Sequence, residues 1–408
     1  MKSTRNTGNF HYFNPGHEAA VLNASPYYMP PAHVAQMQRD LAFLPAWYAS
    51  DGDYVLVEQA LPNDFRNYLN EIFGLNVRAV TGKDLPEITN QINGCKVHLW
   101  GVSPQSIRLF ETLDEKFNLN LSIPRWKDSY AGYCHRRRAA EWLSILCRQL
   151  PGISSQLVPR FYTSVESIED ALQKESGTAF LAKAPYSSSG RGLLWLPKGG
   201  LTRTERQILH GIIKKQKSVA LEYVLRKTTD FAMEFTCENG FNSEFTGYSL
   251  FKTNSKGAYD GNIIASQSDI KQIINKQIGN ELIEKVKNSL MELINIHLIP
   301  FYTGYAGVDM MIYEQNGNVA LHPCVEINLR SNMGIIALNL QKHIASGSQG
   351  YFKIEFASQQ GKLYRKHKEY EQRYPLLLSG GKIVSGYFPL CPVSDGSHYT
   401  AYATAGRK

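Results

Sequence analysis

Two apolar runs separated by an Asn-Gly turn constrain the fold of this 408-residue chain most strongly. Residues 307–313 (Gly-Val-Asp-Met-Met-Ile-Tyr) and 325–330 (Val-Glu-Ile-Asn-Leu-Arg) alternate as strands do, and Asn316-Gly317 lies between them. Asn-Gly is a strong signal for a two-residue hairpin turn. The sequence therefore predicts an antiparallel strand pair in which Gln315 opposes Asn318.

Counting outward from that turn places Asp309 opposite Cys324. Glu326 is then the diagonal neighbour of Asp309 on the same face, about 7–8 Å away by Cα. Because side chains alternate along a strand, Asn328 and Arg330 share the face of Glu326. Two carboxylates, an amide oxygen and a guanidinium on one surface suit an oxygen-ligated divalent cation with a phosphate beside it.

Pro323 is the weak point of this register. It lies inside the second strand and cannot donate a hydrogen bond to a neighbouring strand, which indicates a sheet edge or a bulge. A slip of one residue would reverse every facing. The alternative to a metal site is an ordinary amphipathic hairpin with a solvated polar face.

A second signal lies upstream, in residues 179–195, which read as an apolar strand, a loop and another apolar strand. Lys183 ends the first strand, and Arg191 adds a second positive charge. Small residues give the loop free backbone amides that can approach phosphate oxygens; they are Ser187, Ser188, Ser189, Gly190 and Gly192. The spacing matches neither a Walker A loop nor a Rossmann fingerprint. Taken alone, the segment is equally typical of a plain Ser/Gly hairpin.

A third signal is residues 218–225, an apolar strand with a single acid, Glu222, next to Tyr223. It leads into an alternating strand at residues 230–235. Such a segment can offer backbone groups and a carboxylate to the base and ribose of a nucleotide. The alternative is a core strand that ends at a solvated glutamate.

In this order and spacing the three segments resemble the ATP-grasp superfamily over residues 121–345. The Asp309…Glu-x-Asn-x-Arg element is its more specific part. The resemblance implies that ATP and Mg²⁺ are bound, with Asp309, Glu326 and Asn328 as the metal ligands. Carboxylate and amide oxygens are the ligands that magnesium prefers.

The same resemblance implies roles for the remaining residues. Lys183 and the loop at residues 187–192 would contact the ATP phosphates. Glu222 and the backbone around Tyr223 would border the adenine. Arg330 would touch phosphate or the reacting acyl group, which makes Arg330 and Lys183 the candidate catalytic residues. Lys127 looks like the earlier nucleotide-facing lysine of the family, although a surface lysine before a helix is an equal alternative.

Two positions depart from the family pattern. The loop has serines where many members have a glycine pair, and Gly307 stands where relatives of D-alanine ligase carry an arginine. The activity implied is a ligase that joins a small-molecule carboxylate to an amine or thiol through an acylphosphate. The alternatives are a small-molecule kinase on the same scaffold and a non-catalytic nucleotide-binding module.

The bulk properties restrict the class of protein further. No apolar run reaches about 18 residues, so no membrane span is expected, and the N-terminus lacks the apolar core of a secretory signal. Six scattered cysteines predict reduced thiols in the cytoplasm. The net charge of +8 suits an anionic nucleotide.

Nucleic-acid binding is not expected, although residues 135–138 (His-Arg-Arg-Arg) form a basic patch. They open a helix with apolar residues at helical spacing, so the arginines are interpreted as a solvated face or a phosphate-side rim. No common nucleic-acid-binding motif is present. A homodimer is left open.

The expected fold class is α/β, with an N-terminal parallel α/β domain followed by an ATP-grasp fold of two subdomains that is α+β in character. Strands at residues 54–58, 77–80 and 96–100 alternate with helices at residues 32–43, 62–73 and 104–117, which predicts the parallel sheet. The predicted domains are residues 1–120, 121–345 and 346–408, the last a β-rich extension.

Two other segments are singled out. Residues 14–18 (Asn-Pro-Gly-His-Glu) read as a turn that presents His17 and Glu18. An acceptor-substrate or acid/base pair is the functional interpretation, and a satisfied surface turn is the favoured alternative. The polar segment 253–261 is either a mobile lid or a plain exposed loop.

Overall fold

The chain forms two compact units that are not consecutive in sequence. The computed structural model describes residues 8–187, 190 and 192–407. Unit 1 contains Met1–Lys127, Gly261–Gln267 and Arg330–Lys408, and unit 2 contains Asp128–Asp260 and Ser268–Leu329. The units group the chain differently from the three consecutive segments expected above. Whether those segments act as separate domains stays a prediction.

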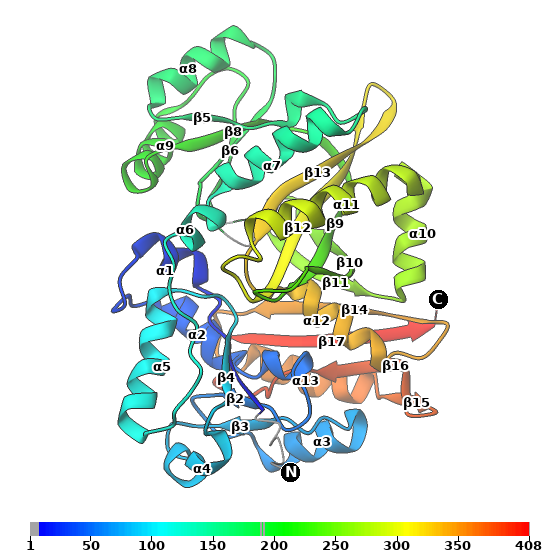
Figure 1. Ribbon diagram of the computed structural model, residues 1–408. Helices are drawn as coiled ribbons and strands as arrows, with labels where there is room; N and C mark the ends of the chain where they lie inside the picture. Colours follow the sequence, from blue (N-terminus) through cyan, green and yellow to red (C-terminus); the bar gives the residue numbers. More distant parts are fainter. Residues whose placement is uncertain (1–7, 188–189, 191, 408) are drawn as a thin grey trace. The chain divides into compact units, whose positions relative to one another are not determined.

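The N-terminal part of unit 1 is a parallel sheet in the order β3-β2-β1-β4 (Figure 1). Its strands are β1 (Asn9–Tyr12), β2 (Tyr54–Leu56), β3 (Arg78–Val80) and β4 (Lys96–Leu99). Its helical segments are α1 (His17–Asn23), α2 (Ala32–Asp40), η1 (Leu44–Trp47), α3 (Asn63–Phe73), α4 (Leu85–Ile92) and α5 (Pro104–Phe117). All three strand pairs are parallel, as the alternation of strands and helices predicted.

The rest of unit 1 is an antiparallel sheet in the order β11-β14-β17-β16-β15. Its strands are β11 (Tyr259–Ile264), β14 (Ser348–Phe356), β15 (Leu377–Ser379), β16 (Lys382–Pro389) and β17 (Tyr399–Arg407). Its helices are α12 (Met333–Leu340), η3 (Gln341–His343) and α13 (Lys362–Arg373). The C-terminal segment is therefore β-rich, as expected, but it also contains a helix of twelve residues.

Unit 2 begins with helices and a small antiparallel sheet in the order β5-β8-β6-β7. The strands are β5 (Arg160–Tyr162), β6 (Phe180–Lys183), β7 (Leu193–Leu196) and β8 (Val219–Tyr223). The helical segments are α6 (Ser129–Cys134), α7 (Arg136–Gln149), η2 (Ser155–Leu157), α8 (Val165–Lys174) and α9 (Arg203–Gln216). Apolar side chains of α8 and α9 cover this sheet and form a core of their own.

The larger antiparallel sheet of unit 2 has the order β13-β12-β9-β10. Its strands are β9 (Arg226–Cys237), β10 (Glu244–Thr253), β12 (Gly304–Gln315) and β13 (Asn318–Asn328), and two further helices are α10 (Gln267–Ile278) and α11 (Asn280–His297). Helix α7 packs on β13. Unit 2 thus contains two antiparallel subdomains, and the expected fold class is confirmed: a parallel α/β part followed by a two-subdomain α+β part.

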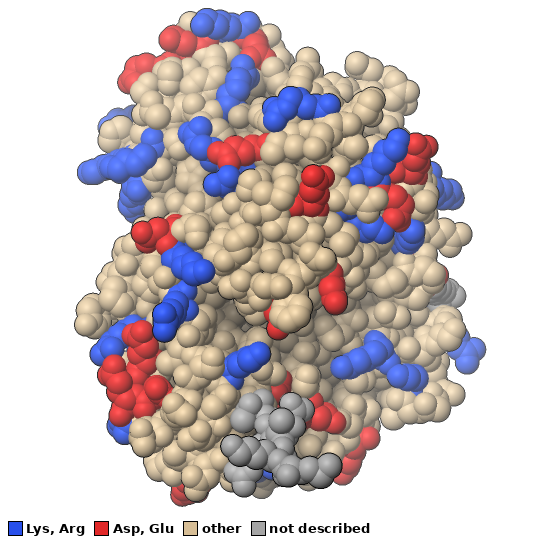
Figure 2. All heavy atoms as spheres, viewed as in Figure 1, with Lys and Arg blue, Asp and Glu red and all other residues tan. Residues whose placement is uncertain are grey.

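Among the described residues no helix is long and apolar enough to cross a bilayer. All six cysteines lie in the described part of the chain and are free. On the face drawn in Figure 2, basic and acidic side chains are interspersed.

Candidate active site

The β12–β13 hairpin has the predicted turn but a different register beyond it. Gln315 pairs with Asn318, as the Asn-Gly turn requires. Between Met311 and Asp309 the register shifts, so that Asp309 lies opposite Glu326. The expected pairing of Asp309 with Cys324 is therefore wrong.

Pro323 explains the shift. It has no N–H to donate, so the strand pair is interrupted there, and residues 323–325 of β13 face Met310 alone. The register moves by two residues, which preserves the facing of side chains. Glu326 thus moves from a diagonal position to one directly across from Asp309, where paired Cα atoms are about 4.5–5.5 Å apart.

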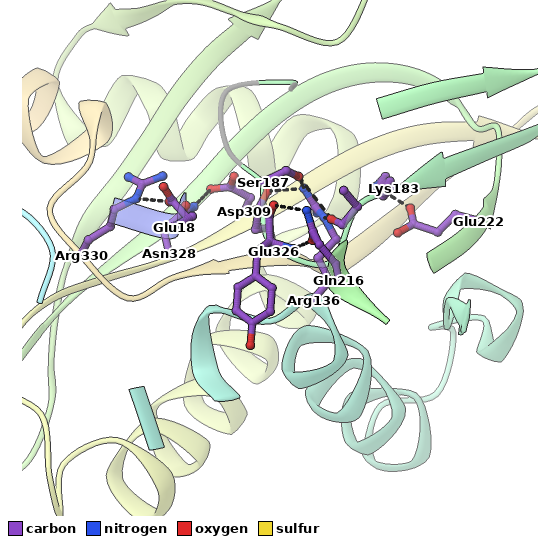
Figure 3. Close-up of polar contacts among 12 residues, drawn as sticks. Glu18, Arg136, Lys183, Ser187, Gln216, Glu222, Asp309, Glu326, Asn328 and Arg330 are labelled. Atoms are coloured by element: carbon purple, nitrogen blue, oxygen red, sulfur yellow. Dashed lines mark hydrogen bonds and ion pairs between the residues drawn. The ribbon is translucent and has the colours of Figure 1, made fainter. Parts of the chain in front are cut away.

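Asn328 completes this face. Asn328 pairs with Gly307 across the two strands, and its side-chain Nδ2 donates to Asp309 Oδ1 at 3.0 Å (Figure 3). Asp309 and Glu326 are partly exposed, whereas Asn328 is 9% exposed. The structure therefore brings together the three side chains that the sequence assigned to a metal ion. The strand ends at Asn328, so the alternation argument does not extend to Arg330.

The donor set fits Mg²⁺ and not a softer metal. In the described part of the chain no group of three or more His, Cys, Asp or Glu side chains could hold a metal ion. The face offers two carboxylates and the amide of Asn328, whose Nδ2 donates to Asp309. Magnesium is commonly bound by one or two carboxylates with waters and substrate phosphates as its other ligands.

Arg136 connects this face to the serine-rich loop. Its Nη2 lies 3.2 Å from Glu326 Oε2 and donates to Ser187 Oγ at 3.2 Å, and its Nε donates to Ala184 O at 3.1 Å (Figure 3). The backbone N–H of Arg136 donates to Pro185 O. With its side chain 7% exposed, this arginine is buried between the loop and the carboxylate. Of the two interpretations of the arginines, the solvated face is therefore wrong for Arg136, and the phosphate-side rim stays a prediction.

The neighbouring arginines do lie at the surface of α7. Arg137 is exposed and stacks on Phe161, and Arg138 pairs with Glu141 at 2.7 Å. Successive side chains point in different directions around a helix, which explains the difference. Arg136 lies on the side of α7 that packs on β13.

The loop after β6 is held at both of its ends. Ala184 N donates to Gly192 O, which continues the β6–β7 hairpin, and Ser187 Oγ donates to Ala184 O. Gly190 has φ +75°, and a Cβ there would lie 2.6 Å from Ala258 Cα. Only glycine fits this close approach to the turn after β10, so the segment at residues 253–261 contacts the loop. Ser188, Ser189 and Arg191 lie outside the described residues.

Lys183 and Glu222 form an ion pair beside the loop. Lys183 Nζ lies 2.5 Å from Glu222 Oε2, and the two side chains are 8% and 12% exposed. They share a face of the small sheet because Lys183 pairs with Ala220, two residues before Glu222. The structure therefore brings together the residues expected at the phosphates and at the adenine.

The charges of Glu222 and Lys183 both affect the pKa of His322 of β13. Burial lowers the pKa of His322 to about 4, with Glu222 opposing the shift and Lys183 adding to it. Its ring is 3% exposed, and Nδ1 has no hydrogen-bond partner among the residues that the structure describes. The imidazole is thus neutral at physiological pH.

At the segment expected to border the adenine, strand β8 extends beyond the end of its neighbour β5. β5 pairs with β8 only over residues 219–221, so Glu222 and Tyr223 extend beyond it. The Tyr223 hydroxyl donates to Glu175, and this hydrogen bond raises the pKa of the tyrosine. Lys127 is exposed and is the last residue of this segment of unit 1; its role stays a prediction.

Arg330 belongs to unit 1, where it pairs with Glu18. Its Nε donates to Glu18 Oε1 at 2.5 Å, and its Nη1 donates to Ser331 O at 3.0 Å. Burial would raise the pKa of Glu18, but the Arg330 guanidinium, together with His17 and the hydrogen bonds to the carboxylate, lowers the pKa to about 2. Glu18 is 9% exposed, so the turn at residues 14–18 is not the surface turn that was favoured.

Two residues near the site were missed in the sequence, His322 and Glu234. His322 was hidden in an apolar strand. Glu234 pairs with Gly307, which puts it on the face of Asn328, and it accepts from Ser249 Oγ at 2.8 Å. At 1% exposure Glu234 is a buried acid. Its place in an alternating apolar strand was the signal that could have found it, since a buried acid needs partners.

No family model matches the chain, and no curated protein matches it in sequence. Solved structures are similar to it over most of their length. One is N5-carboxyaminoimidazole synthetase from Staphylococcus aureus complexed with ADP, at 13% identity and TM-score 0.47, covering 98% of this chain and 93% of that chain.

Two others are similar to a comparable degree. The biotin carboxylase domain dimer of Hydrogenobacter thermophilus 2-oxoglutarate carboxylase, in complex with MgADP, ADP and bicarbonate, has 11% identity and TM-score 0.49, covering 98% and 86% of the two chains. L-amino acid ligase from Bacillus licheniformis has 13% identity and TM-score 0.42, covering 82% and 84%. The similarity is one of fold. Roles for individual residues rest on the geometry given above.

Proposed function

We propose that this chain is an ATP-grasp enzyme that binds Mg-ATP and joins a carboxylate to an amine or thiol through an acylphosphate. One observation carries the proposal. Asp309, Glu326 and Asn328 share one face of β12–β13, and Arg136 connects Glu326 to Ser187 of the loop. Oxygen ligands connected through Arg136 to the serine-rich loop would suit the binding of Mg-triphosphate.

Asp309, Glu326 and the amide oxygen of Asn328 would hold Mg²⁺, which when bound neutralises charge on the phosphates. Arg136 and Lys183 would contact phosphate oxygens, in addition to the backbone amides of the loop. In the present structure both cations are paired with carboxylates. We expect nucleotide binding to exchange part of these contacts for contacts with phosphate.

The adenine would lie against the end of β8, next to Glu222 and the backbone of Tyr223. Arg330 would stabilise the charge on the acyl group as the phosphoryl group is transferred. The work of such a site is positioning and electrostatic stabilisation, so it requires no serine or cysteine nucleophile. The identity of the acid and of the nucleophile is a question for substrate screening.

The first test measures nucleotide binding. Thermal shift and calorimetry with a non-hydrolysable ATP analogue should show stabilisation that depends on Mg²⁺ and that is lost in Asp309→Asn. A protein that gains no stability from the analogue and Mg²⁺ would refute nucleotide binding.

The second test measures ADP and phosphate release with panels of small carboxylic acids, amino acids and amines. A ligase releases both products only when acceptor and nucleophile are present together. ADP release with a stable phosphorylated product and no free phosphate would instead indicate the kinase. Binding without any turnover would indicate the non-catalytic module.

A further inference from the structure

The most unusual sequence of the chain, Asn-Pro-Gly-His-Glu at residues 14–18, folds onto the loop after β4. Asn14 Nδ2 donates to Gly101 O at 2.7 Å, and Gly101 N donates back to Asn14 Oδ1 at 3.0 Å. His17 Nε2 donates to Val102 O at 3.0 Å. Both side chains are buried. The segment is thus fixed to residues 101–102 by three hydrogen bonds.

Gly101 is part of this arrangement. A Cβ at Gly101 would lie 2.3 Å from Cγ of His17, so the imidazole occupies the space that any other residue would need. Burial lowers the pKa of His17, which keeps the ring neutral and Nε2 a hydrogen-bond donor. The position of the residue after His17 is therefore set by tight packing as well as by hydrogen bonds.

The segment that carries Arg330 is fixed to the same loop from the other side. Ser331 N donates to Trp100 O at 2.8 Å, directly before Gly101. Residues 100–102 thus hold both the segment ending in Glu18 and the segment beginning with Arg330. The two meet in the ion pair between Glu18 Oε1 and Arg330 Nε, whose side chains are 11% and 14% exposed (Figure 3).

We propose that Glu18 is a positioning residue that fixes the guanidinium plane of Arg330, so that the guanidinium can stabilise charge on the acyl group. The inference rests on the proposed function, which assigns Arg330 to that group. The guanidinium is planar and rigid, so a carboxylate bound to Nε sets its orientation. Removal of one partner from a buried ion pair is costly, but apolar residues in place of both partners are often equally stabilising, so stability alone does not explain why this pair is ionic.

The contact itself can be tested without any assay of activity. In protein labelled with ¹⁵N-arginine, the Nε–H signal of Arg330 is identified by its absence in Arg330→Lys. We expect its hydrogen exchange in the wild type to be at least about tenfold slower than that of exposed Arg407. Glu18→Gln should lose this protection, and Glu18→Asp should keep part of it.

Glu355→Gln is the matched control, because it removes the acid of another partly buried ion pair of unit 1, with Lys366 at 2.5 Å. Arg330 should keep its protection in that variant. Equal protection of Arg330 in the wild type and in both Glu18 variants would overturn the proposal. Circular dichroism identifies any variant that fails to fold, and Glu18→Asp then decides the question.

The catalytic consequence is tested by a double-mutant cycle on ADP release. Glu18→Gln should lower kcat at least about tenfold and leave the KM for ATP within about twofold of the wild type. If Glu18 acts through Arg330, the double variant with Arg330→Lys is no slower than Arg330→Lys alone. Multiplicative losses would overturn the positioning role.

The two proposals fail in different ways. A wild-type protein that releases no ADP with any acceptor refutes the proposed function and, with it, the catalytic purpose of the contact. The exchange rate of the Arg330 Nε–H still decides whether Glu18 holds the guanidinium. Normal ADP release by Glu18→Gln, in contrast, overturns the positioning role and leaves the proposed function intact.

Discussion

Glu326 has two neighbours that define its part in the site. Asp309 lies across the strand pair, and Arg136 binds the Glu326 carboxylate from helix α7. A carboxylate between a cationic residue and a second acid is well placed to exchange its arginine for a metal ion when phosphates arrive. Substitution of Glu326 therefore separates the function of the site from the stability of the sheet.

We expect Glu326→Gln to lower magnesium-dependent ATP turnover at least about 100-fold, because a neutral amide is a poorer ligand for Mg²⁺. The change is isosteric and the residue is partly exposed, so the melting temperature should change little. Glu314→Gln is the control, since Glu314 pairs with Arg226 at the exposed end of the same hairpin. Near-normal turnover in Glu326→Gln would remove Glu326 from the site.

Glu18 gives a prediction about pH and stability. Its pKa of about 2 lies below the ordinary value of 4.5, so its contribution to stability is complete above about pH 5 and is lost as the pH falls towards 2. Glu18→Gln removes this pH-dependent contribution to the free energy of unfolding, which is worth up to about 3 kcal/mol. Urea unfolding should show a difference between wild type and variant that decreases from pH 6 to pH 3. A difference independent of pH would contradict the assigned ion pair.

The loop between β6 and β7 acts as one element with the turn after β10. Gly190 approaches the backbone of Gly257 and Ala258 so closely that no side chain fits between them. The loop expected to bind phosphate and the polar segment expected as a lid therefore share one contact. If nucleotide binding changes the conformation of the loop, the contact with the turn at Gly257 and Ala258 would change with it.

Gly190→Ala should weaken binding of a Mg-ATP analogue at least about tenfold, since positive φ and the missing space cost a few kcal/mol in the folded loop. Calorimetry measures the affinity. Gly211→Ala, on the open side of helix α9, is the matched control, and we expect it to leave binding unchanged and to stabilise the protein slightly. Unchanged affinity in Gly190→Ala would show that the loop conformation does not matter.

On the scale of the whole molecule, the two ends of the chain share the core of unit 1. Trp47 and Phe65 lie in one cluster with Phe352 and Phe388, and Trp47 Nε1 donates to Leu390 O at 2.8 Å. The residues after 345 are thus part of the core that the N-terminal residues need.

We expect Phe352→Ala to lower the free energy of unfolding by about 3–5 kcal/mol, because Phe352 is fully buried in that core. Phe356→Ala, on the same strand but 55% exposed, should cost much less. Removal of all residues after 345 should leave an insoluble chain. A soluble chain 1–345 with a cooperative unfolding transition would show that the extension is dispensable.

Local patterns determined what the sequence could predict. The Asn-Gly turn specified the β12–β13 hairpin, and the alternation of strands and helices specified the parallel sheet, since both depend on neighbours in the chain. The prediction that Asp309, Glu326 and Asn328 share one face held because a shift of two residues at Pro323 preserves the facing of side chains. These features follow from backbone geometry alone.

The tertiary structure alone decided which charges meet. Arg136 was indistinguishable from Arg137 and Arg138 in the sequence, and only the packing of α7 on β13 brings it to Glu326. Glu18 and Arg330 are 312 residues apart, and no periodicity relates them. Local patterns set which face a side chain is on, whereas a partner distant in the chain is chosen by the packing of whole elements.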